Sequence, residues 1–518
     1  MKSFDRVKKI HGKEYLYEIT PYYDTATKKI KQRSKYIGIV KDGKPVESTV
    51  KTYSYGDLIP VMKAIQDLNI DKILKSIAPD YADLIMIMAI NRIIRHESMN
   101  NISSWFDDTY LSTLYEDLDL SSQNISKCMG NIGRMDLNHA YLNEILKITG
   151  KTDALYYDIT SFSSYSRNME FLEFGYSRSD PDLPQVNVSM VQDRKSGIPI
   201  FYDLYPGSVV DVSTVMNTVE ILRSSGIDNT ILIMDRGMFS STNIDKLLSF
   251  HKSTGIEFIM PATYTLNEVK RIAILSRRTI ERGINMIKVG DEVIFAESRD
   301  INISGNVIKA WIYYQPNRDK IEREVFYSSL YARIDRIKER KIKKYERIKE
   351  IAAEIMGPYL HFISWKYEDK FTVNIMEKAV SQRVNRCGIT ILTFLGDFNS
   401  VDALTMYRER DSVEKLFLNS KSFLGAEPLR VHGIDTLRGH LFVNLIALTV
   451  RSHLIKMMGK TKLIERYSLE KMLLELHKIR KIRLQNNREI ITEITKKQRE
   501  ILENLSIPVD HVPTFLRS

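Results

Sequence analysis

The pattern of apolar and polar positions divides the chain into stretches of different character. In residues 1–50, apolar and polar residues alternate through "KEYLYEITPYY" and "SKYIGIVKDGKP", which predicts a small β unit. From about 56 to 149, apolar residues recur every three or four positions, which predicts helices. A basic helical layer of this kind can bind DNA or pair with another subunit. Simple helical packing explains it equally well.

Residues 151–263 alternate between strands and helices. The predicted strands lie in "DALYYDITSFS", in the two halves of "QVNVSMVQDRKSGIPIFYDLYPG", in "NTILIMDRGMFS" and in "IEFIMPAT". The predicted helices are "STVMNTVEILRSSG" and "STNIDKLLSFHKST". The order β-β-β-α-β-α-β predicts a mixed α/β sheet. In such sheets the residues at the carboxyl ends of strands line the functional crevice.

Residues 264–400 are heterogeneous, and we interpret them as an insertion between the last strand of that sheet and the next helix. Three strands are predicted first, in "DEVIFAES", "NVIKAWIYYQ" and "REVFYSSL". A very basic helix follows, "YARIDRIKERKIKKYERIKEIAAEI", and then the strand-like segments "KFTVNIMEKA" and "GITILTF". Residues 401–457 are predicted to be helical, and 460–505 to form a charged helical tail.

These patterns predict six regions. They are a small N-terminal β unit (1–50), a helical DNA-binding or dimerisation region (51–149), the first part of an α/β core (150–264), a β-rich insertion with a basic helix (265–400), the second part of the core (401–457) and a helical C-terminal tail (458–518).

Composition narrows the possible partners. Of 518 residues, 43% are hydrophobic and 27% are charged, which is ordinary for soluble globular proteins. The formal net charge of +11 favours nucleic acid or another polyanion. Cys128 and Cys387 are the only cysteines and the ten His are scattered, which argues against a disulfide framework and a zinc site. No segment is predicted to be a signal peptide or to span a membrane.

Two acids come where the predicted sheet strands end: Asp158 in "YYDIT" and Asp235 in "IMDRG". A single Asp at such a place is most often a turn or cap residue. Two of them on adjacent strands would lie side by side, and Glu414 would add a third carboxylate from a helix. Carboxylates without His or Cys suit Mg²⁺ or Mn²⁺. Two such ions about 3.5–4 Å apart are a recurrent device for phosphodiester cleavage.

The predicted helix "MYRERDSVEKLFLNSKS", residues 406–422, aligns four polar residues. Tyr407, Arg410, Glu414 and Lys421 fall within an arc of about 60°, beside an apolar stripe that would dock on the sheet. Arg410 and Lys421 can neutralise phosphates, and Tyr407 can hydrogen-bond one. A surface salt bridge between Arg410 and Glu414 is the simpler alternative.

These four residues fit Tyr-x2-Arg-x3-Glu-x6-Lys without a gap, and that spacing resembles the signature of insertion-sequence DDE transposases. "DITSF", "QVNVSMVQDRKSGIPIFYDLYPGSVVD" and "DRGMFSSTNI" resemble the regions around that family's first and second Asp. The likeness runs from about 150 to 450. It implies a mixed α/β, RNase H-like core interrupted by a β-rich insertion, with a helical N-terminal region and a helical C-terminal tail.

The resemblance also implies a chemistry. Asp158, Asp235 and Glu414 would bind two Mg²⁺ (or Mn²⁺) ions and nick DNA at the transposon end. The freed 3′-hydroxyl would attack the opposite strand and then target DNA. The partners would be inverted-repeat DNA at the transposon ends, target DNA and a second copy of the chain, in the cytoplasm of a prokaryote and at its nucleoid.

Further DNA contacts follow from the same resemblance. Tyr407 and Arg410 would hold the 5′ phosphate near a flipped base, and Lys421 a nearby backbone phosphate. Arg236, next to the second Asp, would have a local structural or DNA-contact role. Trp311 and Trp365 are candidates for stacking on an extruded base, with packing in a core as the alternative for each.

Two other functions stay open on the sequence. One is a metal-dependent DNA nuclease that cuts without strand transfer. The other is a catalytically inactive, DNA-binding derivative of a transposase.

Overall fold

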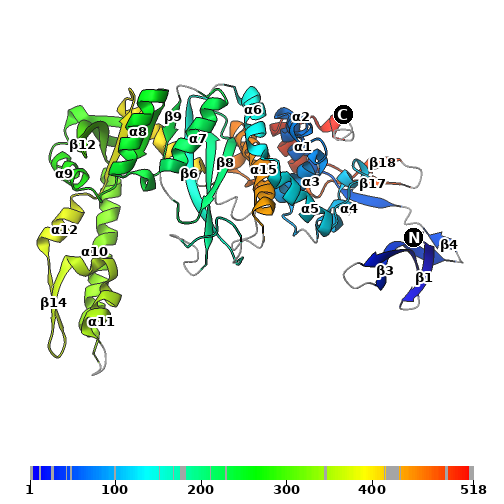
Figure 1. Ribbon diagram of the computed structural model, residues 1–518, viewed down its shortest axis with the longest axis horizontal. Helices are drawn as coiled ribbons and strands as arrows, with labels where there is room; N and C mark the ends of the chain where they lie inside the picture. Colours follow the sequence, from blue (N-terminus) through cyan, green and yellow to red (C-terminus); the bar gives the residue numbers. More distant parts are fainter. Residues whose placement is uncertain are drawn as a thin grey trace. The chain divides into compact units, whose positions relative to one another are not determined.

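The computed structural model in Figure 1 divides into two compact units. Unit 1 comprises residues 1–128 and 450–518, and unit 2 comprises residues 129–449. The structure describes the whole chain except residues 1–3, 11–12, 25–28, 42–43, 47–49, 99–100, 151, 167–168, 175–182, 210–211, 228–229, 343–346, 414, 416–430, 432, 485–487 and 513–518.

Unit 1 begins with the predicted β unit. Its strands form an antiparallel sheet in the order β1-β2-β3-β4: β1 (Phe4–Ile10), β2 (Lys13–Asp24), β3 (Lys29–Lys41) and β4 (Lys44–Val46). The helices predicted from about residue 56 follow: α1 (Leu58–Asp67), α2 (Ile70–Ile77), α3 (Ala82–Ile94), α4 (Ile102–Asp107) and α5 (Ser122–Arg134).

The C-terminal tail is not wholly helical, contrary to the prediction. Between α16 (Leu469–Leu476) and α17 (Lys496–Asn504) lie β17 (Arg480–Arg483) and β18 (Glu489–Ile491), which join β5 (Lys51–Ser54) in the order β18-β17-β5. Lys481 of β17 is 2% exposed, with its ammonium group 4.0 Å from the ring centroid of Tyr110 and 3.2 Å from Glu489. Because a charged residue occupies this core position, the strand lacks the apolar signal that would have predicted it.

Unit 2 is built on a nine-stranded mixed sheet in the order β11-β12-β13-β16-β10-β9-β6-β7-β8. The strands are β6 (Ala154–Ser163), β7 (Gln185–Asp193), β8 (Pro199–Pro206), β9 (Ile231–Ile233), β10 (Glu257–Pro261), β11 (Met286–Val289), β12 (Glu292–Ile303), β13 (Asn306–Tyr314) and β16 (Ile389–Leu395). β9 is parallel to both β6 and β10, and all other neighbours are antiparallel.

Four strands of the predicted β-rich insertion belong to this same sheet. β16 pairs directly with β10, and β13, β12 and β11 extend the same sheet beyond it. Only α10 (Pro316–Glu339), α11 (Ile348–Met356), β14 (Ile363–Tyr367), β15 (Phe371–Ile375) and α12 (Glu377–Val384) share a second hydrophobic core.

The segment "REVFYSSL" is helical, although a strand was predicted for it. It lies within α10, where Phe326, Leu330, Ile334 and Ile337 recur at helical spacing and are buried. The basic helix predicted after it is split into the end of α10 and α11. Arg333 of α10 donates a hydrogen bond to the Ile355 carbonyl at 2.8 Å, so this Arg helps to close the end of α11.

Helices cover both faces of the sheet in unit 2. They are α6 (Leu137–Thr149), α7 (Val212–Ser224), α8 (Ser241–Thr254), α9 (Asn267–Ser276) and α13 (Ser400–Glu409). Tyr156 and Ile233 pack with Ala403 and Leu404 of α13 on one face. The neighbouring Tyr157 points to the opposite face, where its hydroxyl donates to Thr214 of α7 at 2.9 Å.

The long helix α15 (Ile434–Lys460) contains the apolar run "LFVNLIALTVRSHLI". It is the one described helix that is long and apolar enough to cross a membrane, yet 78% of its most apolar window is buried inside the protein. That burial agrees with the core helix predicted from the charges that interrupt the run.

Two glycines let α5 and α15 approach backbone to backbone. A Cβ atom at Gly133 would lie 1.8 Å from the Asp435 carbonyl oxygen, and one at Gly439 would lie 2.1 Å from the Met129 carbonyl oxygen. Neither contact can be relieved by rotating a side chain, because both involve backbone atoms. Gly130, one turn before Gly133, has nothing closer than 3.9 Å.

We expect Gly133→Ala to lower the free energy of unfolding by about 1–3 kcal/mol or more, because the helices must separate to admit the methyl group. Gly130→Ala, on the same helix, should be neutral or should stabilise by up to about 1 kcal/mol, as alanine favours helices. Urea unfolding of both variants measures the difference. Equal effects would show that the close approach of α5 and α15 does not constrain the fold.

Candidate active site

Two acids lie side by side because of the register between β6 and β9. These strands are parallel, and Tyr156 lies opposite Ile233. Asp158 follows Tyr156 by two residues and Asp235 follows Ile233 by two residues, so the two acids lie beside each other. The sequence predicts Asp158 at the end of its strand, and this is wrong. Asp158 lies within β6, which continues to Ser163 along β7. It stands instead where the pairing with β9 ends.

A single guanidinium group connects the two carboxylates. Arg410 Nη1 lies 3.5 Å from Asp158 Oδ2, and Arg410 Nη2 lies 3.4 Å from Asp235 Oδ1. The Arg410 side chain is 8% exposed, Asp158 is 16% exposed and Asp235 is 34% exposed. Two partly buried carboxylates side by side repel each other, and the positive charge between them offsets that repulsion.

Arg410 reaches both acids from the end of α13. The helix begins after Asn399, whose side-chain oxygen accepts hydrogen bonds from the backbone N–H groups of Val401 and Asp402. It ends at Glu409, and residues 411–413 are helical again beyond the turn at Arg410. The continuous helix predicted over 406–422 is therefore interrupted. Its part from 416 to 422 lies outside the described residues.

Polar contacts that the sequence did not indicate fix the end of α13 on the sheet. Glu409 accepts hydrogen bonds from Tyr156 at 3.1 Å and from Arg194 Nε at 2.7 Å, and Arg194 also pairs with Asp153 at 2.8 Å. Burial and the Glu409 charge raise the pKa of Tyr156, so its hydroxyl stays protonated and donates.

A second contact holds the chain just after the turn. The Ser412 hydroxyl donates to Gln192 Oε1 of β7 at 2.8 Å. No spacing in the sequence relates Glu409 to Arg194 or Ser412 to Gln192, since each pair is about 215–220 residues apart.

Tyr407 and Arg236 lie close to the acid pair. Tyr407 is half-buried, with its ring centroid 5.7 Å from the Arg410 guanidinium carbon. Burial raises the pKa of the Tyr407 phenol, the nearby Asp235 adds to the rise, and Arg410 and Arg236 only partly oppose it. Arg236 is exposed and begins a one-turn 3-10 helix, Arg236–Met238, directly after Asp235. A phenol, guanidinium groups and two carboxylates thus lie close together.

Comparison with known families identifies the group to which these residues belong. The family model of the transposase DDE domain matches residues 154–450. The chain belongs to the transposase DDE domain family. Both acids, Tyr407 and Arg410 lie within the matched range. In this DDE-family protein the fold is a mixed α/β structure with one large mixed sheet.

Other comparisons add little. No curated protein matches the chain. A solved structure, that of the piggyBac transposase synaptic complex with hairpin DNA, matches 83% of this chain and 82% of its own at 11% sequence identity and a TM-score of 0.35. That TM-score is too low to establish a common fold.

The two tryptophans that were candidates for base stacking have the contacts of core residues. Trp311 donates its indole N–H to the Phe398 carbonyl at 2.8 Å and stacks on Phe394 with ring centroids 6.4 Å apart. Trp365 packs edge-to-face on Phe371 in the second core, with ring centroids 5.5 Å apart. These contacts favour the packing alternative for both residues.

The third acid and one of the phosphate contacts cannot be placed. Glu414 and Lys421 lie outside the described residues. Among the residues that the structure does describe, no three His, Cys, Asp or Glu side chains form a group suited to a metal ion. The described part of the site is thus the pair of Asp158 and Asp235 with its Arg410 counter-ion.

Proposed function

We propose that the protein is the DNA transposase of an insertion sequence, which cuts and joins DNA strands with Asp158, Asp235 and Glu414 as its acids. The observation that supports this best is the pair of carboxylates on neighbouring parallel strands, bridged by Arg410. We also infer an RNase H-like core for β6 to β10. Three antiparallel strands are followed by two parallel ones, with the first strand in the middle of the five.

The donor set fits a hard divalent cation. Asp158 and Asp235 offer only carboxylate oxygens, which Mg²⁺ and Mn²⁺ prefer, and a positive group already lies between them. Asp158, Asp235 and Glu414 would hold the two ions. When bound, such ions supply an activated water or 3′-hydroxyl and stabilise the leaving oxygen.

The chain's own cationic and phenolic groups would position the DNA. Arg410 neutralises the acid pair when no metal ion is bound. Once metal ions neutralise that pair, the N–H donors of the guanidinium suit a phosphate. Tyr407 keeps its proton, because its pKa is raised, and so acts as a hydrogen-bond donor to a phosphate oxygen. Arg236 and Lys421 would add charge along the same strand.

The partners follow from this chemistry. We propose that the protein binds the inverted-repeat ends of its element and then target DNA, as a homodimer. Cleavage exposes a 3′-hydroxyl, which attacks a phosphodiester of a second strand and releases that strand's own 3′-hydroxyl, so the number of phosphodiester bonds is conserved in the transfer.

We expect Asp235→Asn to lower strand cleavage more than about 100-fold, since even outer-shell changes at metal sites cost about 10–100-fold. The assay incubates full-length protein with Mg²⁺ and duplex DNA carrying the sequences that flank its gene, and follows nicked and joined strands on denaturing gels. Asp245→Asn is the matched control, because Asp245 is exposed on α8 and bonds only to Asn306 among the described residues. Equal cleavage by Asp235→Asn and wild type would overturn the proposal.

The same gels separate the alternatives. Joining of a 3′ end to a second DNA identifies a transposase, whereas cutting without joining identifies a nuclease. Binding by wild type with neither product identifies a DNA-binding derivative.

We expect Arg410→Gln to tighten Mn²⁺ binding in the absence of DNA, on the order of tenfold. A charge about 4 Å from a carboxylate contributes ~1–4 kcal/mol at effective dielectric constants of 80 to 20, and each 1.4 kcal/mol is tenfold. Isothermal titration calorimetry measures the affinity. Arg408→Gln removes an equal charge that pairs with Glu292 instead, and should leave the affinity unchanged. Weaker Mn²⁺ binding in Arg410→Gln would contradict the counter-ion role.

A further inference from the structure

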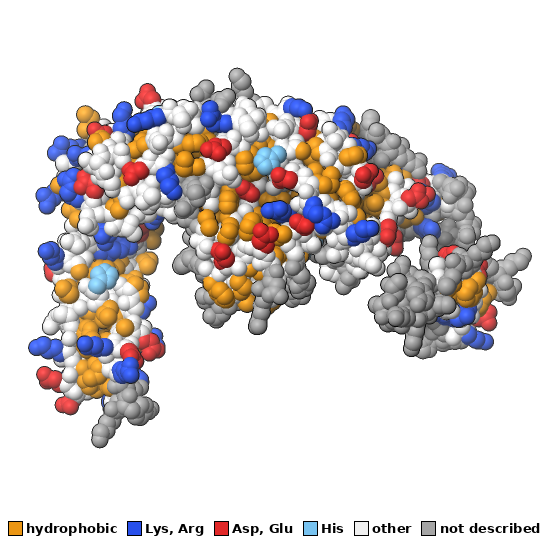
Figure 2. Space-filling model, in the orientation of Figure 1, with side chains coloured by type: hydrophobic (Ala, Val, Ile, Leu, Met, Phe, Trp, Pro, Cys, Tyr) orange, Lys and Arg blue, Asp and Glu red, His pale blue; other side chains and the backbone are white. Residues whose placement is uncertain are grey.

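Positive charge is in excess at both ends of the chain. Residues 1–50 contain 12 Lys and Arg against six Asp and Glu, a formal charge of +6, and residues 450–518 contain 15 against eight, a formal charge of +7. On the face drawn in Figure 2, basic and acidic side chains are interspersed, with no continuous basic surface. A polyanion site at either end therefore requires a local cluster of cations.

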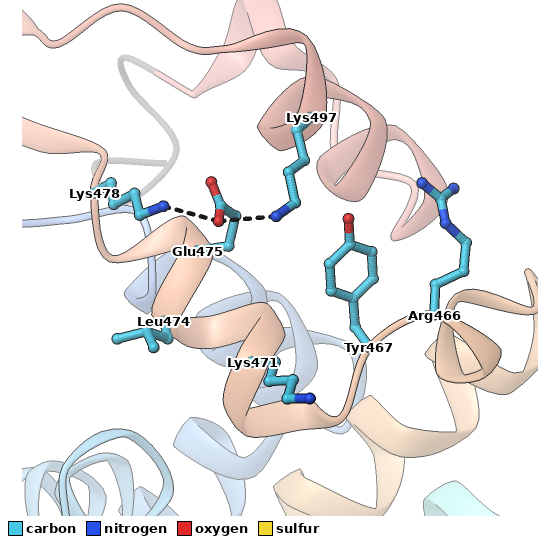
Figure 3. A pocket seen from close by; sticks show the side chains of 7 residues that line it. All are labelled: Arg466, Tyr467, Lys471, Leu474, Glu475, Lys478 and Lys497. Atoms are coloured by element: carbon cyan, nitrogen blue, oxygen red, sulfur yellow. Dashed lines mark hydrogen bonds and ion pairs between the residues drawn. The ribbon is translucent and has the colours of Figure 1, made fainter.

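One such cluster surrounds a pocket of about 280 Å³ in unit 1, shown in Figure 3. It is called the basic pocket below, and it is lined by Arg466, Tyr467, Lys471, Leu474, Glu475, Lys478 and Lys497. These residues come from the turn before α16, from α16 and the residues after it, and from the first turn of α17.

The walls of the basic pocket are fixed to each other. α17 begins with a capping box between Thr495 and Gln498, and Gln498 Nε2 also donates to the Glu475 carbonyl of α16 at 3.1 Å. This hydrogen bond joins α17, which carries Lys497, to α16, which carries Lys471 and Glu475.

Two of the four cations that line the pocket pair with Glu475, whereas Arg466 pairs with Glu500. Lys478 and Lys497 both bind Glu475 Oε2, at 2.9 Å and 3.1 Å, so their ammonium groups converge from two segments, as Figure 3 shows. Each ammonium has three donors and uses one on Glu475, which leaves donors for a further acceptor. Lys471 is exposed and, in the described part of the chain, forms no ion pair.

Solvent exposure decides what kind of anion can bind. The side chains of Lys478 and Lys497 are 63% and 51% exposed, and one exposed ion pair is worth little. A small free phosphate would make only such weak contacts. A polymer of phosphates gains affinity from releasing the counter-ions condensed along its length, and engages several cations at once.

We propose that the basic pocket binds the phosphodiester backbone of double-stranded DNA, independently of its sequence. The choice of DNA among polyanions rests on the proposed function. The contact belongs to unit 1, whereas Asp158 and Asp235 belong to unit 2. Lys471, Lys478 and Lys497 hold phosphate oxygens through their ammonium groups, and Glu475 keeps two of those groups together.

The test measures binding of a fluorescein-labelled duplex of arbitrary sequence, about 30 base pairs long, to full-length protein by anisotropy over a series of salt concentrations. In the triple variant Lys471→Gln, Lys478→Gln, Lys497→Gln we expect affinity near 0.1 M salt to fall about tenfold or more. The slope of log affinity against log salt should become shallower by about two to three, since each phosphate contact contributes about 0.9.

Two controls separate lost charge from lost structure. The matched variant Lys252→Gln, Lys288→Gln, Lys309→Gln removes three exposed lysines of unit 2 and should bind like wild type. The charge-preserving change of Lys471, Lys478 and Lys497 to Arg should restore binding. Circular dichroism should show the same helix content in all variants.

An unchanged affinity and salt slope in the Lys-to-Gln triple variant would overturn the inference. So would loss of binding to phosphatidylserine vesicles with duplex binding intact, which would assign the pocket to a lipid surface. Neither outcome bears on the proposed function, which fails if cleavage survives Asp235→Asn or if the wild-type protein does not cut and join DNA. The two proposals can also fail separately in the other direction. If the triple variant loses duplex binding and the wild-type protein does not cut DNA, the pocket is a DNA contact and the transposase proposal is refuted.

Discussion

The site depends on the register of one pair of parallel strands. With Tyr156 opposite Ile233, the chain delivers Asp158 and Asp235 to the same level and to the face covered by α13. A slip of one residue would turn one acid to the opposite face, because side chains alternate along a strand. Hydrophobic packing of Tyr156 and Ile233 thus fixes the distance between two charges that would otherwise repel. Arg410 lies between them, and its charge offsets their repulsion.

The position of Arg410 depends in turn on contacts made far from it in sequence. Leu404 packs α13 on the sheet, Glu409 accepts from Arg194 and Tyr156, and Ser412 bonds to Gln192. Arg410 lies between these anchors, so its buried guanidinium is held against the two acids. For a DDE-family protein, this couples the strand that carries the first acid to the helix that leads to Glu414.

The sequence predicts those elements that a local pattern of apolar residues marks. The apolar runs before Asp158 and Asp235 are strands, and the order of strands and helices from 154 to 261 follows the predicted pattern. The partners of strands are not local, so the sequence does not indicate that β12, β13 and β16 extend the same sheet. "REVFYSSL" has aromatic and β-branched residues typical of strands, but burial of Phe326 and Leu330 in the second core makes it helical. The break at Arg410 has no Pro or Gly to indicate it, and the Arg194 and Gln192 contacts have no signal in the sequence.

The most direct measurement of the central claim is a crystal structure of the protein soaked in Mn²⁺, with anomalous scattering to locate the ions. The claim predicts an anomalous peak about 2.0–2.2 Å from carboxylate oxygens of both Asp158 and Asp235, close to the distance that Mg²⁺ adopts, with the Arg410 guanidinium displaced from between them. A guanidinium that still bridges the two acids, with manganese bound elsewhere or not at all, would contradict it.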